Sequence, residues 1–86
     1  MRLRIGRDAA KSIRRLDTGT AKAILETLNR ITADPFAHHA NVTRLTGIND
    51  GFRLRHGDLR VLYRVDRNAG EVCVDRVGRR GEVYKG

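Results

Sequence analysis

The 86-residue sequence is poor in the residues that mark secreted and membrane proteins. Its single cysteine, Cys73, excludes a disulfide within the monomer, and its place in an apolar run indicates a buried free thiol. No apolar run approaches the roughly 18 residues of a membrane-spanning helix. The opening MRLRIGRD lacks the apolar segment of a secretory signal peptide. We therefore expect a cytoplasmic protein without a membrane partner.

Lysine and acidic residues are also scarce. Of 18 basic residues 15 are arginine, and only 10 residues are acidic, which gives a net charge of +8. A high-GC genome explains the preference for arginine over lysine, but it does not explain the positive excess. Residues 1–43 hold eight basic and four acidic side chains, and residues 44–86 hold ten and six. The charge thus indicates a polyanionic partner, either nucleic acid or an acidic protein, and any patch is assembled by the fold.

The composition is that of one small folded domain. Hydrophobic residues make up 40% of the chain and charged residues 33%, which excludes a disordered segment. A chain of this length buries about 60–65% of the surface that its unfolded form exposes, so its core is modest. We expect a single domain over residues 1–86.

The first 35 residues predict a strand and two helices. Leu3 and Ile5 alternate with arginines, which is typical of a short strand. A first helix begins near Asp8, and a second is capped by Thr18 or Thr20 and ends at Asp34–Pro35. Two or three residues join them, which favours an antiparallel helical hairpin. The apolar stripes of the two helices are Ala9, Ile13 and Leu16, and Ala21, Ile24, Leu25, Leu28 and Ile31.

The second half predicts three antiparallel strands after a loop. Residues 36–51 show little periodicity, with a short extended piece at Val42–Leu45. Alternating residues then indicate strands over 52–55, 59–65 and 71–77, separated by Gly-containing turns. The order β–α–α–β–β–β indicates an α+β fold, with the helical hairpin on one face of a small antiparallel sheet. The predicted core joins the helix stripes to Phe52, Leu54, Val61, Tyr63 and Val65.

The same alternation gathers arginines on the opposite face. Arg53, Arg55 and Arg60, with Arg64 as a further candidate, alternate with core residues, and Arg79 or Arg80 and Tyr84 follow the last strand. Clustered guanidiniums suit a phosphodiester whose charge rises in the transition state. A tyrosine can orient a 2′-hydroxyl, accept its proton once deprotonated, or stack on a base. The alternative is a solvated face with Asp58, Asp66 and Asp75 as counter-ions.

The histidines carry less weight. His38 and His39 lie in the loop and His56 at a turn, and a structural or solvated role is the better expectation for all three. No Cys or acidic residue stands at metal-ligand spacing, so we expect no metal site. Phosphate-binding loops, dinucleotide motifs and Ser-His-Asp candidates are also missing.

The second half resembles a known family. RLTGINDGFRLRHGDLRVLYRVD, followed by VCVDRVGRRGEVY, is similar to the RelE/ParE superfamily of type II toxin–antitoxin toxins, on the RelE side. That resemblance implies a RelE-like, microbial-ribonuclease-like fold. It also implies an mRNA endonuclease that acts in the ribosomal A site, needs no metal or small-molecule cofactor and is silenced by an acidic antitoxin. Such enzymes direct a 2′-hydroxyl at the adjacent phosphate and leave a 2′,3′-cyclic phosphate.

The family motif carries roles over to individual positions. Arg53 and Arg55 match its basic pair, Arg60 the arginine of its next strand, and Arg80 and Tyr84 its closing arginine and tyrosine. The resemblance makes these five residues the catalytic candidates. The other residues expected to bind RNA are Arg44, Arg64 and Arg79.

Two positions depart from the motif. Leu59 stands where an aromatic residue is usual, and Arg79 stands where many members have histidine. The second change removes a group that titrates near neutrality, and arginine is a poor proton shuttle. Two alternatives therefore stay open. One is a ParE-like inhibitor of DNA gyrase, and the other is a degenerate toxin that binds RNA without cutting it.

Overall fold

The computed structural model describes residues 1–81, which form two helices and five strands. The predicted β–α–α–β–β–β order is confirmed with one addition, because the short extended piece expected at Val42–Leu45 is a paired strand, and the ends of the elements shift by a few residues. In chain order the elements are β1 (Arg2–Ile5), α1 (Arg7–Arg14), α2 (Thr18–Ala33), β2 (Val42–Arg44), β3 (Gly51–His56), β4 (Leu59–Asp66) and β5 (Glu71–Arg79).

All five strands form one sheet in the order β1-β5-β4-β3-β2. Strands β2 to β5 pair antiparallel, as expected, whereas β1 pairs parallel with β5 and sets Leu3 opposite Val72. The sheet is therefore mixed within an α+β fold. A parallel pair needs a long connection between its strands, and here the chain passes through both helices and three strands before β5 meets β1.

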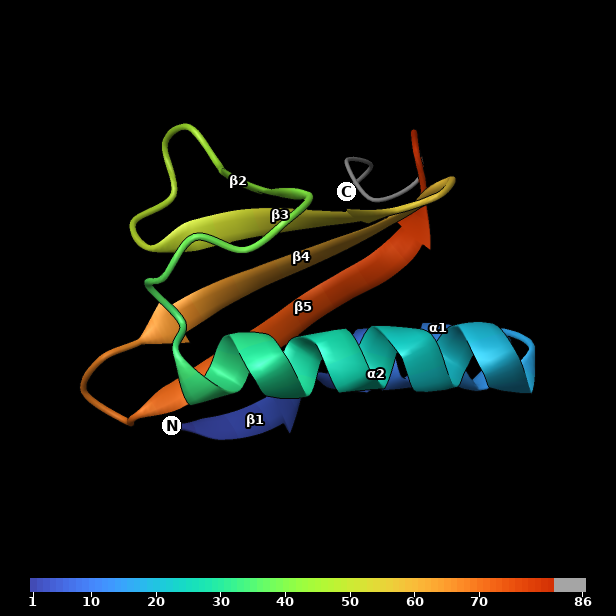
Figure 1. Cartoon of the computed structure of the whole chain (residues 1–86), viewed down its shortest axis with the longest axis horizontal. Helices are drawn as coiled ribbons and strands as arrows, with labels where there is room; N and C mark the ends of the chain where they lie inside the picture. The colour runs from blue at the N-terminus through green and yellow to red at the C-terminus, as the bar shows by residue number, and fades with distance from the viewer. Residues whose placement is uncertain (82–86) are drawn as a thin grey trace.

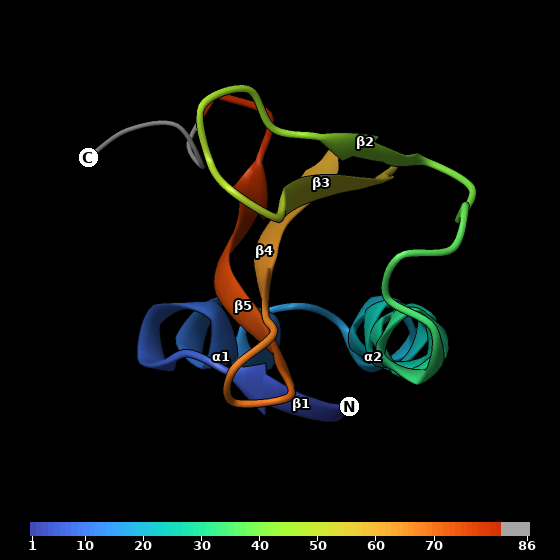
Figure 2. The ribbon, with the colours of Figure 1, turned by 90° about the vertical axis from the view of Figure 1, so that its left-hand side faces the viewer.

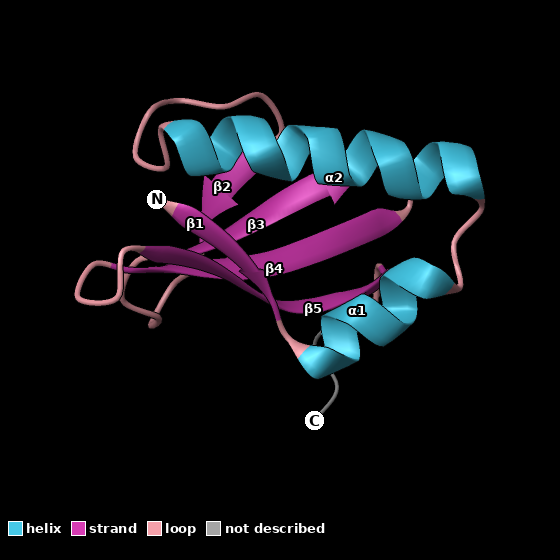
Figure 3. Ribbon diagram, turned by 90° about the horizontal axis from the view of Figure 1, so that it is seen from below, coloured by secondary structure: helices cyan, strands magenta, loops and turns pink. Residues whose placement is uncertain are grey.

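Both helices cover the same face of the twisted sheet (Figures 1 and 3). Three residues, 15–17, join them, as the sequence predicted. They diverge rather than pack along their length, and Figure 2 shows β1 between them in that view. Their stripes meet the sheet in one buried core of Ala9, Ile13, Ile24, Leu28, Ile31, Phe52, Leu54, Val61, Tyr63, Val65, Val72, Val74 and Val77.

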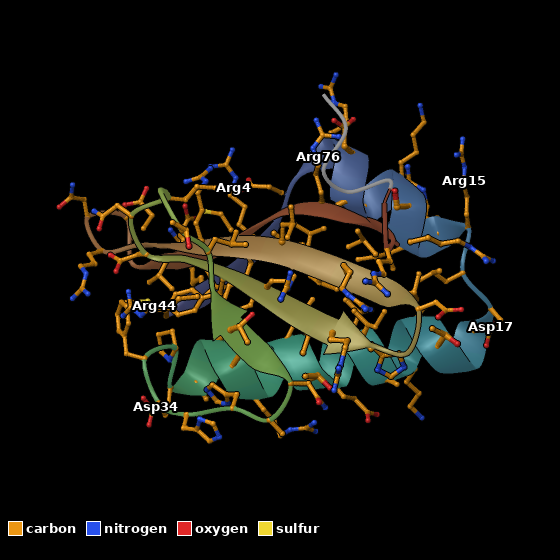
Figure 4. The ribbon with its side chains drawn as sticks, turned by 90° about the horizontal axis from the view of Figure 1, so that it is seen from above. Arg4, Arg15, Asp17, Asp34, Arg44 and Arg76 are labelled. Atoms are coloured by element: carbon orange, nitrogen blue, oxygen red, sulfur yellow. The ribbon has the colours of Figure 1, made fainter. Side chains whose placement is uncertain are left out.

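The second helix begins at Thr18, one to three residues earlier than a cap at Thr18 or Thr20 implies, and its cap is Asp17. Asp17 has the extended backbone of an N-cap, and its Oδ2 accepts from the backbone N–H of Thr20 at 3.0 Å. The Thr20 hydroxyl donates to Oδ1 at 2.7 Å. These bonds lower the pKa of the Asp17 carboxyl below its ordinary value. Asp17 and Asp34 mark the two ends of α2 (Figure 4).

The strand register fixes which side chains face away from the helices. Phe52 pairs with Tyr63 and Leu54 with Val61, and all four are buried in the core. Because neighbours along a strand point to opposite faces, the intervening Arg53 lies on the other face, together with Arg55 and Arg60. The predicted arginine face is therefore present (Figure 4 looks onto this side of the sheet).

Candidate anion-binding site

Four of the predicted arginines line one hollow of about 460 Å³ on the arginine face. Strand β3 contributes Arg53 and Arg55, β4 contributes Arg60, and Arg80 follows β5. The loop between α2 and β3 closes the other side. The described residues that line the hollow are His38, His39, Asn41, Val42, Thr43, Arg53, Arg55, Arg60 and Arg80. Within residues 1–81, none of the lining side chains is a carboxylate.

Arg55 and Arg60 are direct cross-strand partners. The backbone N–H of Arg55 donates to the Asn41 carbonyl on the opposite side, so the two arginines form a non-hydrogen-bonded pair. Their Cα atoms then lie roughly 4.5 Å apart, and like charges in this position are destabilising. Such an arrangement is relieved by an anion between the guanidiniums.

Hydrogen bonds hold both of these guanidiniums. Nη1 of Arg60 donates to the carbonyls of Gly57 at 2.7 Å and Leu59 at 2.9 Å, which ties it to the β3–β4 turn. Gly57 has a φ of 58°, as the first central residue of a two-residue hairpin turn requires. Nη2 of Arg55 donates to Oδ1 of Asn41 at 3.3 Å. The donors are therefore positioned before a ligand binds.

A β-bulge decides which arginine after β5 enters the hollow. The register shifts between Leu62 and Tyr63, so that Val74 and Val77 both face the core although they are three residues apart. Simple alternation would have put Val74 and Arg80 on the same face. The bulge instead sends Arg80 to the arginine face, where its N–H donates to the Asp58 carbonyl at 3.0 Å.

Arg79 lies away from this hollow. It lines a separate space of about 280 Å³ against α1, together with Ser12 and Arg15. The replacement of histidine by arginine at this position therefore adds charge beside the helix and not among the four clustered arginines.

The remaining predicted site residues are placed elsewhere. Arg44 pairs with Phe52 in the register and covers its ring at 5.2 Å from the centroid, so it lies on the core side of the sheet edge. Arg64 is on the arginine face but pairs with Asp75 at 3.1 Å. This is one of the counter-ion contacts that the solvated-face alternative predicted. Tyr84 lies outside the described residues.

The sequence pattern missed the loop contribution to the hollow. His38, His39 and Asn41 come from a stretch without periodicity, so no regular spacing placed them against β3. The one local signal was Asn41, because asparagine tolerates the left-handed region that its φ of 64° occupies. Both His38 and His39 line the hollow, and the structural or solvated role expected for them stays a prediction.

An ion pair secures the far end of this loop. Asp50 is buried, and its carboxylate accepts from Nε of Arg67 at 2.8 Å and from Nη2 at 3.2 Å. This bond lowers the pKa of the Asp50 carboxyl. The same guanidinium lies over the ring of Phe36, 4.1 Å from its centroid. Both ends of the loop are thereby attached to the β4–β5 turn.

Other ligand classes find less support in residues 1–81. No group of three or more His, Cys, Asp or Glu side chains comes together there as metal ligands would. Cys73 is a buried free thiol, as predicted. None of the described helices has the length and apolar character to span a bilayer.

The comparison with known proteins assigns the family. Residues 3–84 match the family described as the ParE toxin of type II toxin-antitoxin system, parDE. The chain belongs to the ParE toxin family. The predicted membership of the RelE/ParE superfamily is therefore confirmed, and the protein is a toxin of a type II toxin–antitoxin system.

Solved structures similar to this ParE-family toxin include RelE proteins. The isolated RelE toxin of E. coli is 26% identical with a TM-score of 0.79, over 96% of this chain and 89% of that one. The intact E. coli RelBE toxin-antitoxin complex is 26% identical with a TM-score of 0.77, over 92% of this chain and 95% of that one. The archaeal RelE-RelB complex from Pyrococcus horikoshii OT3 is 25% identical with a TM-score of 0.79, over 93% of this chain and 94% of that one. These likenesses confirm the RelE-like fold; no curated protein matches the chain.

Proposed function

We propose that this toxin is a metal-independent endonuclease that cuts mRNA in the ribosomal A site. The observation that carries the proposal is the convergence of Arg53, Arg55, Arg60 and Arg80 on one hollow whose described lining has no carboxylate. The likeness to RelE toxins supports the same assignment. Translation would stop because messages are cut in the cytoplasm as they are read.

In this proposal the arginines bind the scissile phosphate. The 2′-hydroxyl of the preceding nucleotide attacks phosphorus, and the 5′-oxygen leaves, so that a 2′,3′-cyclic phosphate forms. Negative charge grows on the phosphoryl oxygens in the transition state, and prepositioned guanidiniums stabilise it more strongly than they stabilise the ground state. Tyr84 would position or deprotonate the 2′-hydroxyl. Arg44, Arg64 and Arg79 would contact RNA outside the hollow.

The proposal includes an acidic cognate antitoxin. A net charge of +8 favours an acidic protein partner, and the RelE structures from E. coli and Pyrococcus horikoshii contain RelB antitoxins. An antitoxin that covers the arginine hollow would block the phosphate site directly.

The experiment is a ribosome assay with purified toxin and a defined mRNA. We expect wild-type protein to cut the message within codons in the A site and to leave a 2′,3′-cyclic phosphate. Arg80→Ala should lower the cleavage rate about 10²–10³-fold, the loss seen when one transition-state donor is removed. Intact mRNA with folded wild-type toxin would overturn the proposal.

Arg79→Ala is the matched control. It removes a neighbouring arginine with the same charge, but from the other side of β5. We expect cleavage close to wild type, with at most a few-fold weaker RNA binding. Equal loss of cleavage in both variants would show that net charge, and not the hollow, matters.

Inhibition of DNA gyrase is the second candidate, because the matching family is named for ParE. This activity would not need the arginine hollow or Tyr84. Blocked supercoiling with intact mRNA would select it.

A further inference from the structure

The proposed cleavage needs a group that accepts the proton of the 2′-hydroxyl. The four arginines of the hollow cannot serve, because a guanidinium stays protonated in proteins. Arg79, at the position where many relatives carry histidine, lies against α1. The structure brings two other histidines, His38 and His39, to the wall of the hollow. An imidazole is the side chain whose ordinary pKa best suits proton transfer near neutral pH.

The contacts of His39 fix how its ring is protonated. Its Nε2 lies 2.7 Å from the backbone carbonyl oxygen of Asp34. A carbonyl oxygen can only accept a hydrogen bond, so Nε2 carries the proton and donates it. In the neutral ring Nδ1 is then the unprotonated nitrogen, which is the state that a general base requires. A base held in one tautomer by a second group is the usual arrangement in acid–base catalysis.

Backbone hydrogen bonds also fix the loop around His39. The His39 carbonyl accepts from the N–H of Val42 at 3.3 Å, and the Asn41 carbonyl accepts from the N–H of Arg55 at 2.9 Å. The first bond closes a turn at the start of β2, and the second joins the loop to β3, the strand that carries the basic pair. His39 is half-buried, whereas His38 is exposed. The loop therefore presents one positioned imidazole beside the arginines.

We propose that His39 is the proton acceptor of the cleavage reaction, an assignment that rests on the proposed endonuclease function. The 2′-hydroxyl proton passes to Nδ1 of His39 while the bond from the 2′-oxygen to phosphorus forms. The bond from phosphorus to the 5′-oxygen breaks, and the 5′-oxygen leaves with a proton from water. His39 returns its proton to solvent. Tyr84 is then left with the positioning role.

The test uses the ribosome assay with three single variants. His39→Ala should lower the cleavage rate about 10²-fold or more, the usual contribution of a general base. His39→Gln should be equally impaired, because its amide N–H can still donate to the Asp34 carbonyl but its side chain cannot take up a proton. His56→Ala, which removes a histidine that does not line the hollow, is the matched control and should stay within a few-fold of wild type.

Two readouts separate proton transfer from loop structure. Binding of the full-length toxin to a non-cleavable oligonucleotide with a 2′-deoxy position should be unchanged in His39→Gln. Added imidazole should restore part of the cleavage by His39→Ala, and it should not restore Arg80→Ala. A purely structural role predicts the reverse: Gln would rescue and imidazole would not.

The outcomes distinguish this assignment from the proposed function. Active wild-type toxin together with an active His39→Gln variant overturns the assignment and leaves the endonuclease in place. The same holds if His56→Ala loses as much cleavage as His39→Ala. Wild-type toxin that leaves mRNA intact overturns both.

Discussion

At the scale of single residues, Tyr63 is an unusual feature of the core. It is 1% exposed and stacks on Phe52, with ring centroids 5.3 Å apart. Within residues 1–81, its hydroxyl has no hydrogen-bond partner. Burial raises the pKa of Tyr63 to about 12. A buried hydroxyl without a partner destabilises the folded state, because it loses the hydrogen bonds that water gave it.

We expect Tyr63→Phe to raise the free energy of unfolding at pH 7 by about 1 kcal/mol relative to wild type. Above the ordinary tyrosine pKa of about 10, the unfolded chain releases its proton while folded Tyr63 keeps it. Wild-type stability should therefore fall as the pH rises from about 10 towards 12, and the variant should lack this component. Urea unfolding at pH 7 and at alkaline pH measures both.

Tyr84→Phe removes the other tyrosine of the chain and serves as the control. It should keep the alkaline loss of stability. Equal curves for wild type and Tyr63→Phe at high pH would contradict the assignment of that loss to Tyr63.

The residues of the candidate site differ in how far the sequence reveals them. Arg53, Arg55 and Arg60 are predicted by strand alternation, because a period of two leaves no choice of face. His39 is not, because its position depends on loop bonds to Asp34 and Val42 that no periodic pattern encodes. The functional value of a loop residue becomes visible once the strands beside it are in place.

At the scale of elements, α2 shows how far an apolar stripe determines packing. Leu28 is fully buried under the sheet, whereas Leu25, three residues earlier, is only partly covered. Leu28→Ala should lower the free energy of unfolding by about 2–5 kcal/mol, the usual loss for a large core side chain. Leu25→Ala, on the same helix with the same change, should lose less than half of that. Chemical denaturation of both variants measures the difference.

Equal losses at the two positions would mean that helix propensity, which is the same for both changes, outweighs burial.

Strand β5 is an element whose side-chain directions the alternating pattern does not predict. Its bulge puts Val74 and Val77 on one face of the sheet. Alternation counted from Val74 therefore predicts the wrong face for the β5 side chains after the bulge. The family motif, and not the period, singled out Arg80, which the structure brings to the hollow.

At the scale of the whole molecule, the positive charge is spread over many sites, but the arginines differ in what they contact. Arg2 and Arg4 lie near Glu71, at 3.7 and 3.8 Å, and Arg64 lies near Asp75. In the part of the chain that the structure describes, the hollow gathers four arginines on one wall. RNA affinity should therefore come mainly from this region.

Salt dependence tests this distribution. If four arginines each neutralise a phosphate, the logarithm of the binding constant for single-stranded RNA should fall against the logarithm of salt concentration with a slope of about −3. Arg60→Ala should reduce the magnitude of that slope by about 0.7. Arg4→Ala, the matched control beside Glu71, should leave it unchanged. Fluorescence anisotropy titrations over a range of salt concentrations give the slopes, and equal changes in the two variants would contradict a localised site.

The pairing of β1 with β5 has a consequence for how the toxin is made. The first strand of the chain completes the sheet edge with the last strand, and the hollow needs both the loop at His39 and Arg80. Chains emerge from the ribosome with the N-terminus first, and contacts between distant segments form late. We therefore expect a nascent chain to lack the assembled hollow until β5 and Arg80 have been synthesised. Under the proposed function, this order of assembly would keep the toxin inactive while its own message is being translated.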